Sequence, residues 1–345
     1  MNAAAKNYDG VNKYIRITDI DEASSTYTDK DIVSPDGILT DNYLVNNRDI
    51  LLARTGASTG KSYLYKQSDG KLYYAGFLIR ANVTTHDPYF VFSQLHTHRY
   101  WRWVSIMSAR SGQPGINSQE YSSFPIYTTS IEEESKIAKL LSLLDERIAT
   151  QNKIIEDLKL LKSAIRKKVF VSLKEEHTES CEINQLLTYE QPTAYIVTND
   201  EYSTDTTLIP VLTANKGFVL GYTDEDFSIY QKGECIIFDD FTMDAKYVSF
   251  PFKVKSSAIK ILTAKPNVNL RFMFEYLSYL ELKSEEHKRH YISEIASLVV
   301  ELPSKEMQNK IASLMTSLDN KLALEENTKV KYEDEKQYQL SQMFI

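Results

Sequence analysis

The sequence predicts an α+β fold in which two mixed, β-rich domains are joined by two long α-helices packed as an antiparallel coiled coil. Residues 136–145 return in closely similar form at 310–319, which is 174 positions later, and the match continues to Phe170 and Phe344. Apolar residues recur every three, four or seven positions around both copies. Short strand-like runs fill the rest of the chain. A repeat close to half the chain length indicates two copies of one unit.

The first domain is predicted to span residues 1–128. Runs rich in β-branched and aromatic residues predict strands at 14–17, 49–53 and 73–79. A helix is expected to open at Pro88, because proline is tolerated in the first helical turn. Few residues precede Tyr14, whereas about 24 separate Phe170 from the corresponding strand at Tyr195. We therefore expect the first domain to lack an opening segment that the second possesses.

The first long helix is predicted over residues 130–172, with Ser130 as its N-cap and Glu133 completing a capping box. Neither Gly nor Pro occurs from 130 to 170. A helix of about 40 residues is roughly 60 Å long, which calls for a partner helix. Gln151 and Lys162 interrupt its apolar seam, which comprises Ile137, Leu141, Leu144, Ile148, Ile155 and Leu158.

The second domain is predicted to span 178–302 and the second long helix 303–345. Strands are expected at 209–213, 217–221, 234–238 and 252–255, and a shorter helix at 270–282. The alternation of apolar and basic residues in 252–255 predicts a strand with one face in solvent. The seam of the second helix holds Ile311, Met315, Leu318 and Leu322, and then weakens at Glu325 and Lys329. A core helix or a homodimeric coiled coil is the alternative, but two matched seams in one chain favour pairing within the chain.

The bulk composition bounds the class of protein. With 345 residues, 42% of them hydrophobic, the chain can form two domains, each with a core. Two cysteines do not make a disulfide framework, and neither a signal peptide nor a run of about 20 apolar residues is present. These features predict a cytoplasmic protein. The net charge of −7 counts against binding by phosphate neutralisation alone, although the charge that matters is local.

Motifs for catalysis are incomplete. Residues 56–62 resemble a phosphate-binding P-loop but have three residues between the glycines instead of four. Residues 87–90 resemble the Asp-Pro-Pro-Tyr of adenine methyltransferases without the second proline, and no Gly-x-Gly occurs. The histidine pairs 96/98 and 287/290 have no cysteine nearby, and the acidic runs 132–134 and 333–335 are expected to be solvated helix faces. We predict no metal, no cofactor and no enzymatic activity.

Two clusters of cations and aromatic residues predict nucleic-acid contacts. Residues 96–103 interleave His, Arg, Tyr and Trp, and residues 283–291 form a similar cluster at the corresponding place in the second half. Cations supply phosphate contacts, while Arg, Gln, Asn, Ser and Thr can recognise base edges. The alternative for each cluster is a helix end whose cations are favoured by the helix dipole. Finding both at equivalent places favours the nucleic-acid interpretation.

Several short strings add to this evidence: 49–57 and 112–117 in the first half, 189–197, 210–215, 237–242 and 252–258 in the second, the two Ile-Ala…Leu-Asp helices, and the final 342–344. No single string is specific, but their combination is. Taken together, they resemble the specificity (S) subunit of type I restriction–modification systems over nearly the whole chain.

The resemblance implies two target-recognition domains, each recognising one half of a split, asymmetric site on double-stranded DNA, with the helices setting the spacer. It also implies docking of two modification (M) subunits, which carry the S-adenosylmethionine chemistry, and partnership with restriction (R) subunits. On this basis we assign phosphate contacts to Lys61, Arg99, Arg102, Lys216, Lys246, Lys288 and Arg289, and base recognition to Arg54, Arg110, Gln113, Asn215 and Thr242.

The exposed helix face, marked by Arg147 and its equivalent Lys321, is expected to bind the M subunits. The main alternative is an adaptor with two β-rich interaction domains on a coiled-coil spacer and no role in DNA binding. A nuclease or methyltransferase acting alone is a second alternative.

Overall fold

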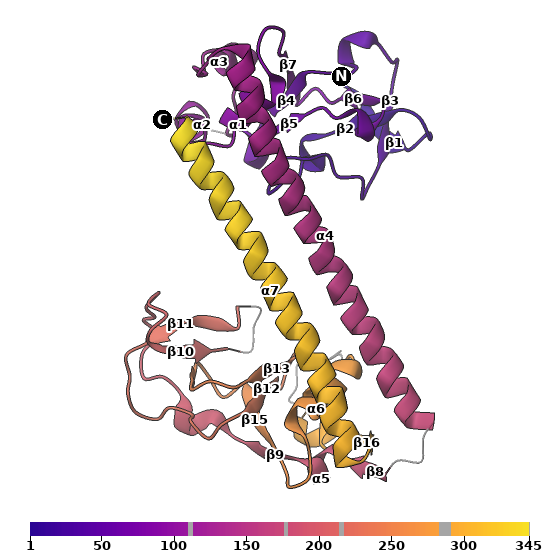
Figure 1. The fold of residues 1–345 in the computed structure, drawn as a ribbon, viewed down its shortest axis with the longest axis vertical. Coiled ribbons are helices and arrows are strands. Elements are labelled where there is room, and N and C mark those ends of the chain that lie inside the picture. Colours follow the sequence, from indigo (N-terminus) through magenta and orange to yellow (C-terminus); the bar gives the residue numbers. More distant parts are fainter. Residues whose placement is uncertain (110–112, 176–178, 214–216, 283–290, 345) are drawn as a thin grey trace. The chain divides into compact units, whose positions relative to one another are not determined.

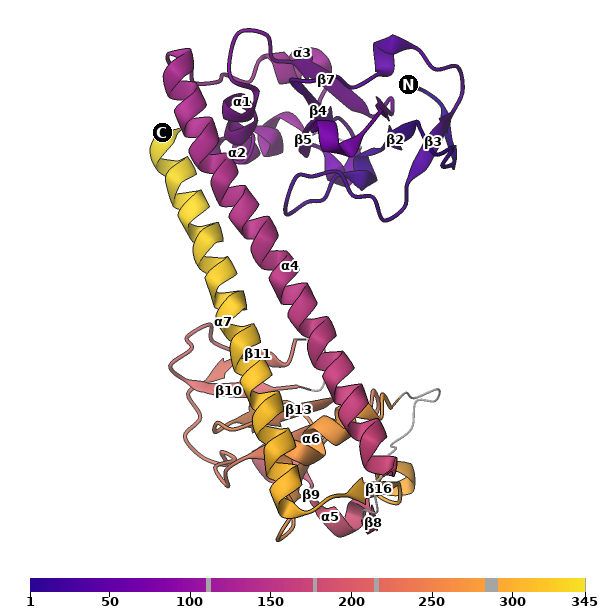
Figure 2. The same ribbon diagram turned by 45° about the vertical axis from the view of Figure 1, so that its right-hand side comes forward.

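The computed structural model describes residues 1–109, 113–175, 179–213, 217–282 and 291–344, which form two compact units (Figures 1 and 2). Unit 1 comprises Met1–Ile154 and Glu325–Ile345, and unit 2 comprises Ile155–Leu324. Each long helix therefore contributes one part to each unit. The boundary between the two compact units falls inside the long helices, whereas the domain boundaries predicted from the sequence fall at the ends of these helices.

Unit 1 is built on the three-stranded antiparallel sheet β5-β4-β7. All five residues of the central strand β4 are buried, so its sequence is a continuous apolar run after Asp49. Leu51 and Ala53 pack into one core cluster, while Ile50 and Leu52 pack against the helices on the other face. The elements are β1 (Ala4–Asn7), β2 (Lys13–Ile15), β3 (Val33–Asp36), β4 (Asp49–Ala53), β5 (Ser62–Leu64), β6 (Leu72–Tyr74), β7 (Leu78–Asn82), α1 (Pro88–Gln94), α2 (His98–Met107) and α3 (Ser118–Ser122).

The smaller sheets of unit 1 hold the start of the chain. β1 pairs with β3 in an antiparallel ribbon, and β2 pairs with β6 in parallel. The single strand predicted over 73–79 is wrong, because β6 and β7 are separate strands joined by a turn at residues 75–77. The turn passes so close to the chain start that a Cβ on Gly76 would lie 2.0 Å from the Asn2 side-chain oxygen.

Unit 2 is built on the four-stranded antiparallel sheet β13-β12-β15-β9. β12, β15 and β13 correspond to β4, β7 and β5, and β9 adds a strand beside β15. Within the described part of unit 1, no strand pairs in this way with the outer edge of β7. The elements are β8 (Glu179–Glu182), α5 (Ile183–Leu186), β9 (Leu187–Glu190), β10 (Ile209–Leu212), β11 (Val219–Thr223), β12 (Cys235–Asp239), β13 (Ala245–Val248), β14 (Lys253–Val254), β15 (Ile259–Ala264), α6 (Leu270–Tyr279) and β16 (Val299–Leu302).

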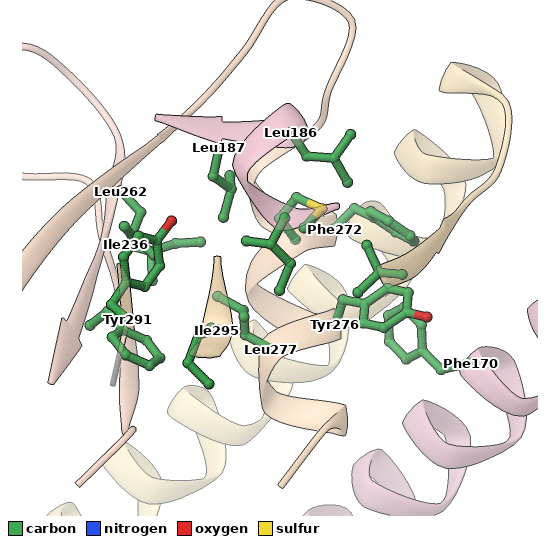
Figure 3. Packing of buried hydrophobic residues seen from close by; sticks show 14 of the residues in the cluster. Phe170, Leu186, Leu187, Ile236, Leu262, Phe272, Tyr276, Leu277, Tyr291 and Ile295 are labelled. Atoms are coloured by element: carbon green, nitrogen blue, oxygen red, sulfur yellow. The ribbon is translucent and has the colours of Figure 1, made fainter. Parts of the chain in front are cut away.

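The main core of unit 2 lies between this sheet and α6 (Figure 3). Phe272 and Tyr276 of α6 turn toward the first long helix, where the Phe170 ring lies 5.5 and 4.7 Å from theirs. Leu277 packs in the same cluster as Ile236 of β12. Burial of these aromatic side chains, at about 25 cal/mol per Å² of apolar surface, fixes α6 between the sheet and the helix.

The prediction of a strand with one solvated face at 252–255 is wrong for Lys253. Phe252, Lys253 and Val254 are all fully buried. The Lys253 ammonium forms an ion pair with Glu225, donates to the Phe227 carbonyl at 2.9 Å and lies 4.3 Å from the Phe227 ring. Burial opposes ionisation of Glu225, but Lys253 and the amide and hydroxyl of Thr198 outweigh it and lower the pKa of Glu225 to about 2. A buried lysine is tolerated here because its charge is paired.

The two long helices are α4 (Ile131–Glu175) and α7 (Lys305–Met343), and they pack antiparallel within each unit. In unit 1, Lys336 bonds Asp145 at 2.6 Å, and Gln151 donates to the Glu325 carbonyl at 3.1 Å. In unit 2, Lys162 bonds Asp319. The predicted fold class is confirmed. Of the predicted seam, Leu141, Ile155, Ile311 and Met315 are buried, and Ile137, Leu144, Ile148, Leu158, Leu318 and Leu322 are half-buried.

The start of α4 departs from the predicted capping box. Ser130 does cap the helix, since its hydroxyl accepts the Glu133 amide at 3.3 Å. The carboxylate that turns back is Glu134, which accepts the Asp87 amide at 2.9 Å and contacts the His86 ring at 2.8 Å. Glu134 is fully buried, so the prediction that residues 132–134 form a solvated face is wrong at this position.

Candidate nucleic-acid interface

In each unit the same positions join a domain helix to a long helix. The amide of Asp87, the N-cap of α1, donates to Glu134 of α4. The amide of Asn269, the N-cap of α6, donates at 2.9 Å to Gln308, which stands 174 positions after Glu134. The anchor is therefore part of the repeat, although neither side chain was selected from the sequence.

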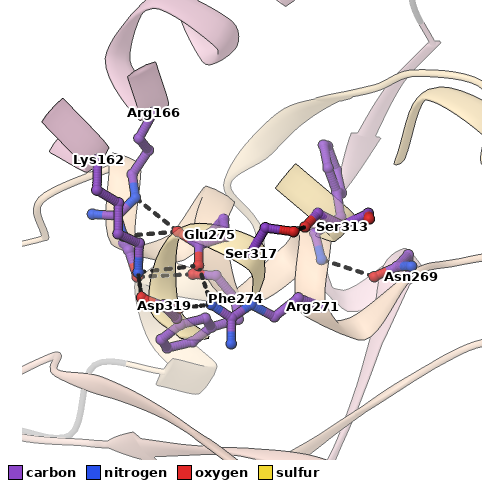
Figure 4. Close-up of polar contacts among 11 residues, drawn as sticks. Lys162, Arg166, Asn269, Arg271, Phe274, Glu275, Ser313, Ser317 and Asp319 are labelled. Atoms are coloured by element: carbon purple, nitrogen blue, oxygen red, sulfur yellow. Dashed lines mark hydrogen bonds and ion pairs between the residues drawn. The ribbon is translucent and has the colours of Figure 1, made fainter. Parts of the chain in front are cut away.

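A second anchor involves the acid that closes each copy of the repeated decapeptide. In unit 2, Asp319 binds Lys162 of α4 and Arg271 of α6 (Figure 4). The fully buried Glu275 adds ion pairs at 2.7 Å with both Arg166 and Arg271.

In unit 1 the equivalent acid, Asp145, accepts from the Tyr89 hydroxyl and from Lys336. Tyr89 and Arg271 both stand two residues after the N-cap of their helix. The arrangement is thus repeated with different chemistry: Asp319 pairs with two cations in unit 2, whereas Asp145 pairs with one cation and one tyrosine hydroxyl in unit 1.

Two of the predicted base-recognition residues of unit 1, Arg54 and Gln113, are brought together at the end of β4. Beyond β4, the Arg54 carbonyl accepts the Ile116 amide at 2.9 Å, and Gly56 donates to the Pro114 carbonyl at 2.9 Å. These bonds bring the segment 113–116 alongside the segment 54–60. Arg54 and Gln113 are both exposed, and the Gln113 amide nitrogen lies 3.0 Å from where a Cβ on Gly56 would stand.

Two buried tyrosine side chains bind the backbone at this end of β4. Tyr100 donates to the Gly60 carbonyl at 2.8 Å, and Tyr121 donates to the Ala53 carbonyl at 2.6 Å. Burial raises the pKa of Tyr121 to about 12, so the hydroxyl stays neutral and keeps its donor hydrogen. The P-loop-like string 56–62 is a short 3-10 turn followed by β5, without the helix whose N-terminus would receive a phosphate.

The end of β12 is the corresponding point in unit 2. The Asp239 carboxylate accepts the amides of Phe241 and Thr242 at 2.8 and 3.2 Å, which shapes a tight turn with Thr242 exposed. The next residue, Asp240, is buried, pairs with Lys260 at 3.4 Å and accepts the Tyr291 amide at 2.9 Å. Thr242 is thus held at the end of the central strand, as Arg54 is in unit 1.

Comparison with known proteins decides the family. The family model described as the type I restriction modification DNA specificity domain matches residues 1–160 and 175–333. The chain belongs to this family. The prediction of a type I specificity subunit is thereby confirmed, and family membership places the chain with the non-catalytic DNA specificity subunits and does not favour the adaptor alternative.

Individual relatives agree with this assignment. The chain is 39% identical over 142 residues to the specificity subunit of the type I restriction enzyme EcoR124I/EcoR124II of Escherichia coli, covering 39% of this chain and 35% of that protein. It is 25% identical over 288 residues to the putative MjaX specificity subunit of Methanocaldococcus jannaschii, covering 75% and 68%. The alignment thus spans about a third of the first relative and two thirds of the second.

Solved structures share the fold. The crystal structure of a type I restriction–modification S subunit from M. genitalium matches with a TM-score of 0.68 at 15% identity, covering 98% of this chain and 89% of that one. A structure described as showing the complex assembly and conformational transition of the type I R-M system matches with a TM-score of 0.55 at 14% identity, covering 95% and 90%.

Some of the cations predicted to contact phosphates are paired or packed within unit 1, and others are exposed. Lys61 pairs with Glu22 at 3.2 Å. The Arg99 guanidinium lies 4.3 Å from the Tyr127 ring and 4.9 Å from the Phe124 ring and donates to the Pro125 carbonyl, so packing already accounts for its position. Arg102 of α2 and Lys246 of β13 are exposed, and neither side chain bonds a described residue.

The remaining predicted contacts, Arg110, Asn215, Lys216, Lys288 and Arg289, lie outside the described residues, as do His287 and His290. His96 is held by the Phe92 carbonyl and the Ser25 hydroxyl, both at 3.0 Å. Burial, helped by the Lys336 charge, lowers the pKa of His96 to about 4, so the ring is neutral. In the described ranges, no three His, Cys, Asp or Glu side chains are grouped to hold a metal ion.

Proposed function

We propose that this chain is the DNA-binding specificity subunit of a type I restriction–modification complex, which recognises a bipartite site on double-stranded DNA and docks the M subunits. One observation carries the proposal: the two units share a backbone frame at the strand end but present different side chains there. Such a frame suits two half-sites of unlike sequence. The shared backbone would place the side chains, and the side chains that contact bases would determine which sequence is recognised.

The shared frame is visible in single hydrogen bonds. The Arg54 amide donates to the Phe77 carbonyl at 3.0 Å, and the equivalent Asp240 amide donates to the Ala258 carbonyl at 3.1 Å. Arg54 is exposed and can form a bidentate contact with guanine, whereas Asp240 is buried and leaves Thr242 as the exposed polar side chain. The two units would therefore recognise different bases with one architecture.

Phosphate contacts would come from local cations despite the net charge of −7. Exposed Arg102 and Lys246 are the strongest candidates among the described residues, because neither side chain bonds another described residue of its unit. Lys61 and Arg99 already have partners within unit 1, and we propose them as further phosphate contacts for their charge, together with the basic residues outside the described ranges.

A salt-titrated DNA-binding assay on the assembled complex tests the proposal. Affinity should fall steeply with salt, and Arg102→Ala or Lys246→Ala should each reduce the slope of log K against log salt by about 1. Lys30→Ala, at an exposed cation in unit 1, is the matched control and should leave the slope unchanged. Binding that does not depend on salt would contradict the proposal.

The outer faces of the long helices support two docking sites for M subunits. Leu140 and Leu314, which are 174 positions apart, are 43% and 44% exposed, and each follows a lysine by four positions. Arg147 shares the face of Leu140 at helical spacing, and its guanidinium lies 5.7 Å from the Tyr332 ring. This part of unit 1 also has a hollow of about 280 Å³ lined by Leu143, Glu146, Arg147, Thr150, Gln151 and Tyr332. R subunits would join the same complex.

Charge substitution at the two leucines tests this stoichiometry. Leu140→Asp or Leu314→Asp alone should leave one M subunit bound, and the double variant none, as measured by native mass spectrometry. Leu160→Asp is the matched control, because Leu160 is 69% exposed and its equivalent in the second helix is already Asp334. Two M subunits retained on the double variant would overturn the docking face.

The spacer between the half-sites would be set by α4 and α7, which run through both units without interruption. Inserting seven residues at equivalent points of both helices should lengthen the spacer of the recognised site and leave its halves unchanged, as mapped by sequencing of bound DNA. No helix in the described ranges has the length and apolar character to span a bilayer. We place the complex in the cytoplasm with its DNA.

A further inference from the structure

We infer that Phe77 contacts a base, recognising the 5-methyl group of a thymine in the half-site bound by unit 1. The inference rests on the proposed DNA recognition and names a specificity residue that the sequence did not indicate. It starts from an aromatic side chain that is 61% exposed at the turn between β6 and β7. A single exposed apolar side chain is common on protein surfaces, so the inference depends on how this one is held and on which residues lie beside it.

The turn that carries Phe77 is fixed by backbone bonds on three sides. Its own carbonyl accepts the Arg54 amide at 3.0 Å, the Leu78 amide donates to Ala75 at 2.9 Å, and the Gly76 amide donates to Met1 at 2.8 Å. Because the backbone is held, the ring is presented without the entropy cost of ordering a loop on binding.

Phe77 lies among the predicted base-recognition residues. Ala53 is the partner of Leu78 in the β4–β7 register, so Arg54 and Phe77 stand opposite each other one step beyond it. Opposite residues of an antiparallel pair project on the same face with Cβ atoms about 5 Å apart. The Arg54 carbonyl in turn binds the segment that carries Gln113, so a cation, an amide and an aromatic ring share one strand end.

Unit 2 provides an internal comparison. The position equivalent to Phe77 is Ala258, whose carbonyl accepts the Asp240 amide at 3.1 Å in the same arrangement. Asp240 points inward to Lys260, so unit 2 has neither the cation nor the ring at this place. The fold therefore does not need an aromatic residue here, and the ring is a property of the unit 1 half-site.

The chemistry of the three side chains points to the major groove. Arginine pairs with guanine and glutamine with adenine at their major-groove edges, and phenylalanine makes apolar contact with the thymine methyl group. A ring beside Arg54 and Gln113 would therefore meet a thymine in the same groove.

Replacement of thymine by uracil tests the contact, using the chain assembled with its M subunits and a mapped DNA site. Burying one methyl group contributes about 0.8 kcal/mol, which corresponds to about fourfold in affinity. Wild type should lose about fourfold at one thymine when it is replaced by uracil, and Phe77→Ala should bind both DNAs equally. Phe77→Leu should retain part of the discrimination. Val11→Ala, at an apolar residue of unit 1 that is also 61% exposed, should behave as wild type.

Two results would overturn the inference: Phe77→Ala retains the full uracil sensitivity, or Phe77→Ala weakens M-subunit binding and leaves base discrimination intact. The second would assign Phe77 to a protein contact. Failure of the proposed function is distinguishable, because the wild-type complex would then bind DNA without any sequence preference.

Discussion

Glu275 offers the sharpest test of how a recognition domain is fixed to the long helices. Its carboxylate is fully buried and contacts three cations, at 2.7 Å from Arg166, 2.7 Å from Arg271 and 3.7 Å from Lys162. Replacing Glu275 with glutamine removes the negative charge that these three cations share. Lys162 and Arg271 still pair with Asp319.

The expected cost follows from the burial of the network. Removing one partner of a buried ion pair typically costs 3–5 kcal/mol, because the remaining charge is left uncompensated. A domain of ordinary stability has about 5–15 kcal/mol in total, so Glu275→Gln should remove a large part of the stability of unit 2. Unit 1 shows how to offset this: the positions equivalent to Glu275 and Arg166 are Ser93, which donates to the Tyr89 carbonyl, and the buried Leu340. The double variant Glu275→Ser with Arg166→Leu should therefore recover at least half of the loss.

Hydrogen exchange of the full chain in increasing denaturant measures both units at once. Protection of α6 should fall in Glu275→Gln while protection of α1 in unit 1 stays unchanged. The double variant should restore protection in α6. A loss below about 1 kcal/mol in Glu275→Gln, or a double variant no more stable than the single one, would refute the argument that this network holds the domain.

Three further outcomes follow from buried ionisable groups. Lys253→Met should destabilise unit 2 by about 3–5 kcal/mol, because Glu225 loses its cation, whereas the exposed Lys255→Met should change the unfolding free energy by less than about 0.5 kcal/mol. The pKa of His96 is about 4 in the folded chain and about 6.5 when unfolded, so the unfolded state binds more protons between these values and unit 1 loses stability as pH falls from 6.5 to 4. His96→Gln should flatten that part of the stability profile in denaturant titrations at several pH values, and the exposed His98→Gln should not.

The long helices were largely predictable because their information is local. The 174-position repeat and the apolar spacing located the seam, and the polar interruptions Gln151 and Lys162 are the residues that bond across it, to Glu325 and Asp319. Ser130 at the start of α4 was likewise predictable, since a cap depends on the residues next to it.

The errors at Glu134 and Lys253 share one physical cause, which is a partner remote in sequence. The sequence around Glu134 predicts a solvated acidic run, but the Glu134 carboxylate accepts a hydrogen bond from the amide of Asp87, 47 positions away. Lys253 looked like the solvated face of a strand, but Glu225 lies 28 positions away. Nothing within a few residues of either position signals these bonds.

The candidate DNA site was predictable in part. Arg54 and Gln113 were selected as residue types that can contact bases, and the structure brings their segments together through bonds that the sequence does not encode locally. Arg99 fits the same composition argument, yet its packing against Tyr127 and Phe124 gives it a structural role. Phe77 could not be selected, because an exposed aromatic residue and a buried one look alike in a strand-like run.

Identification of the DNA sites recognised by the assembled complex, by sequencing what it selects from a random DNA pool, tests the central claim most directly. The account predicts a motif of two defined halves separated by a fixed spacer, with Arg54→Ala relaxing one half and Thr242→Ala the other. A single contiguous motif, or one in which both substitutions relax the same half, would contradict it.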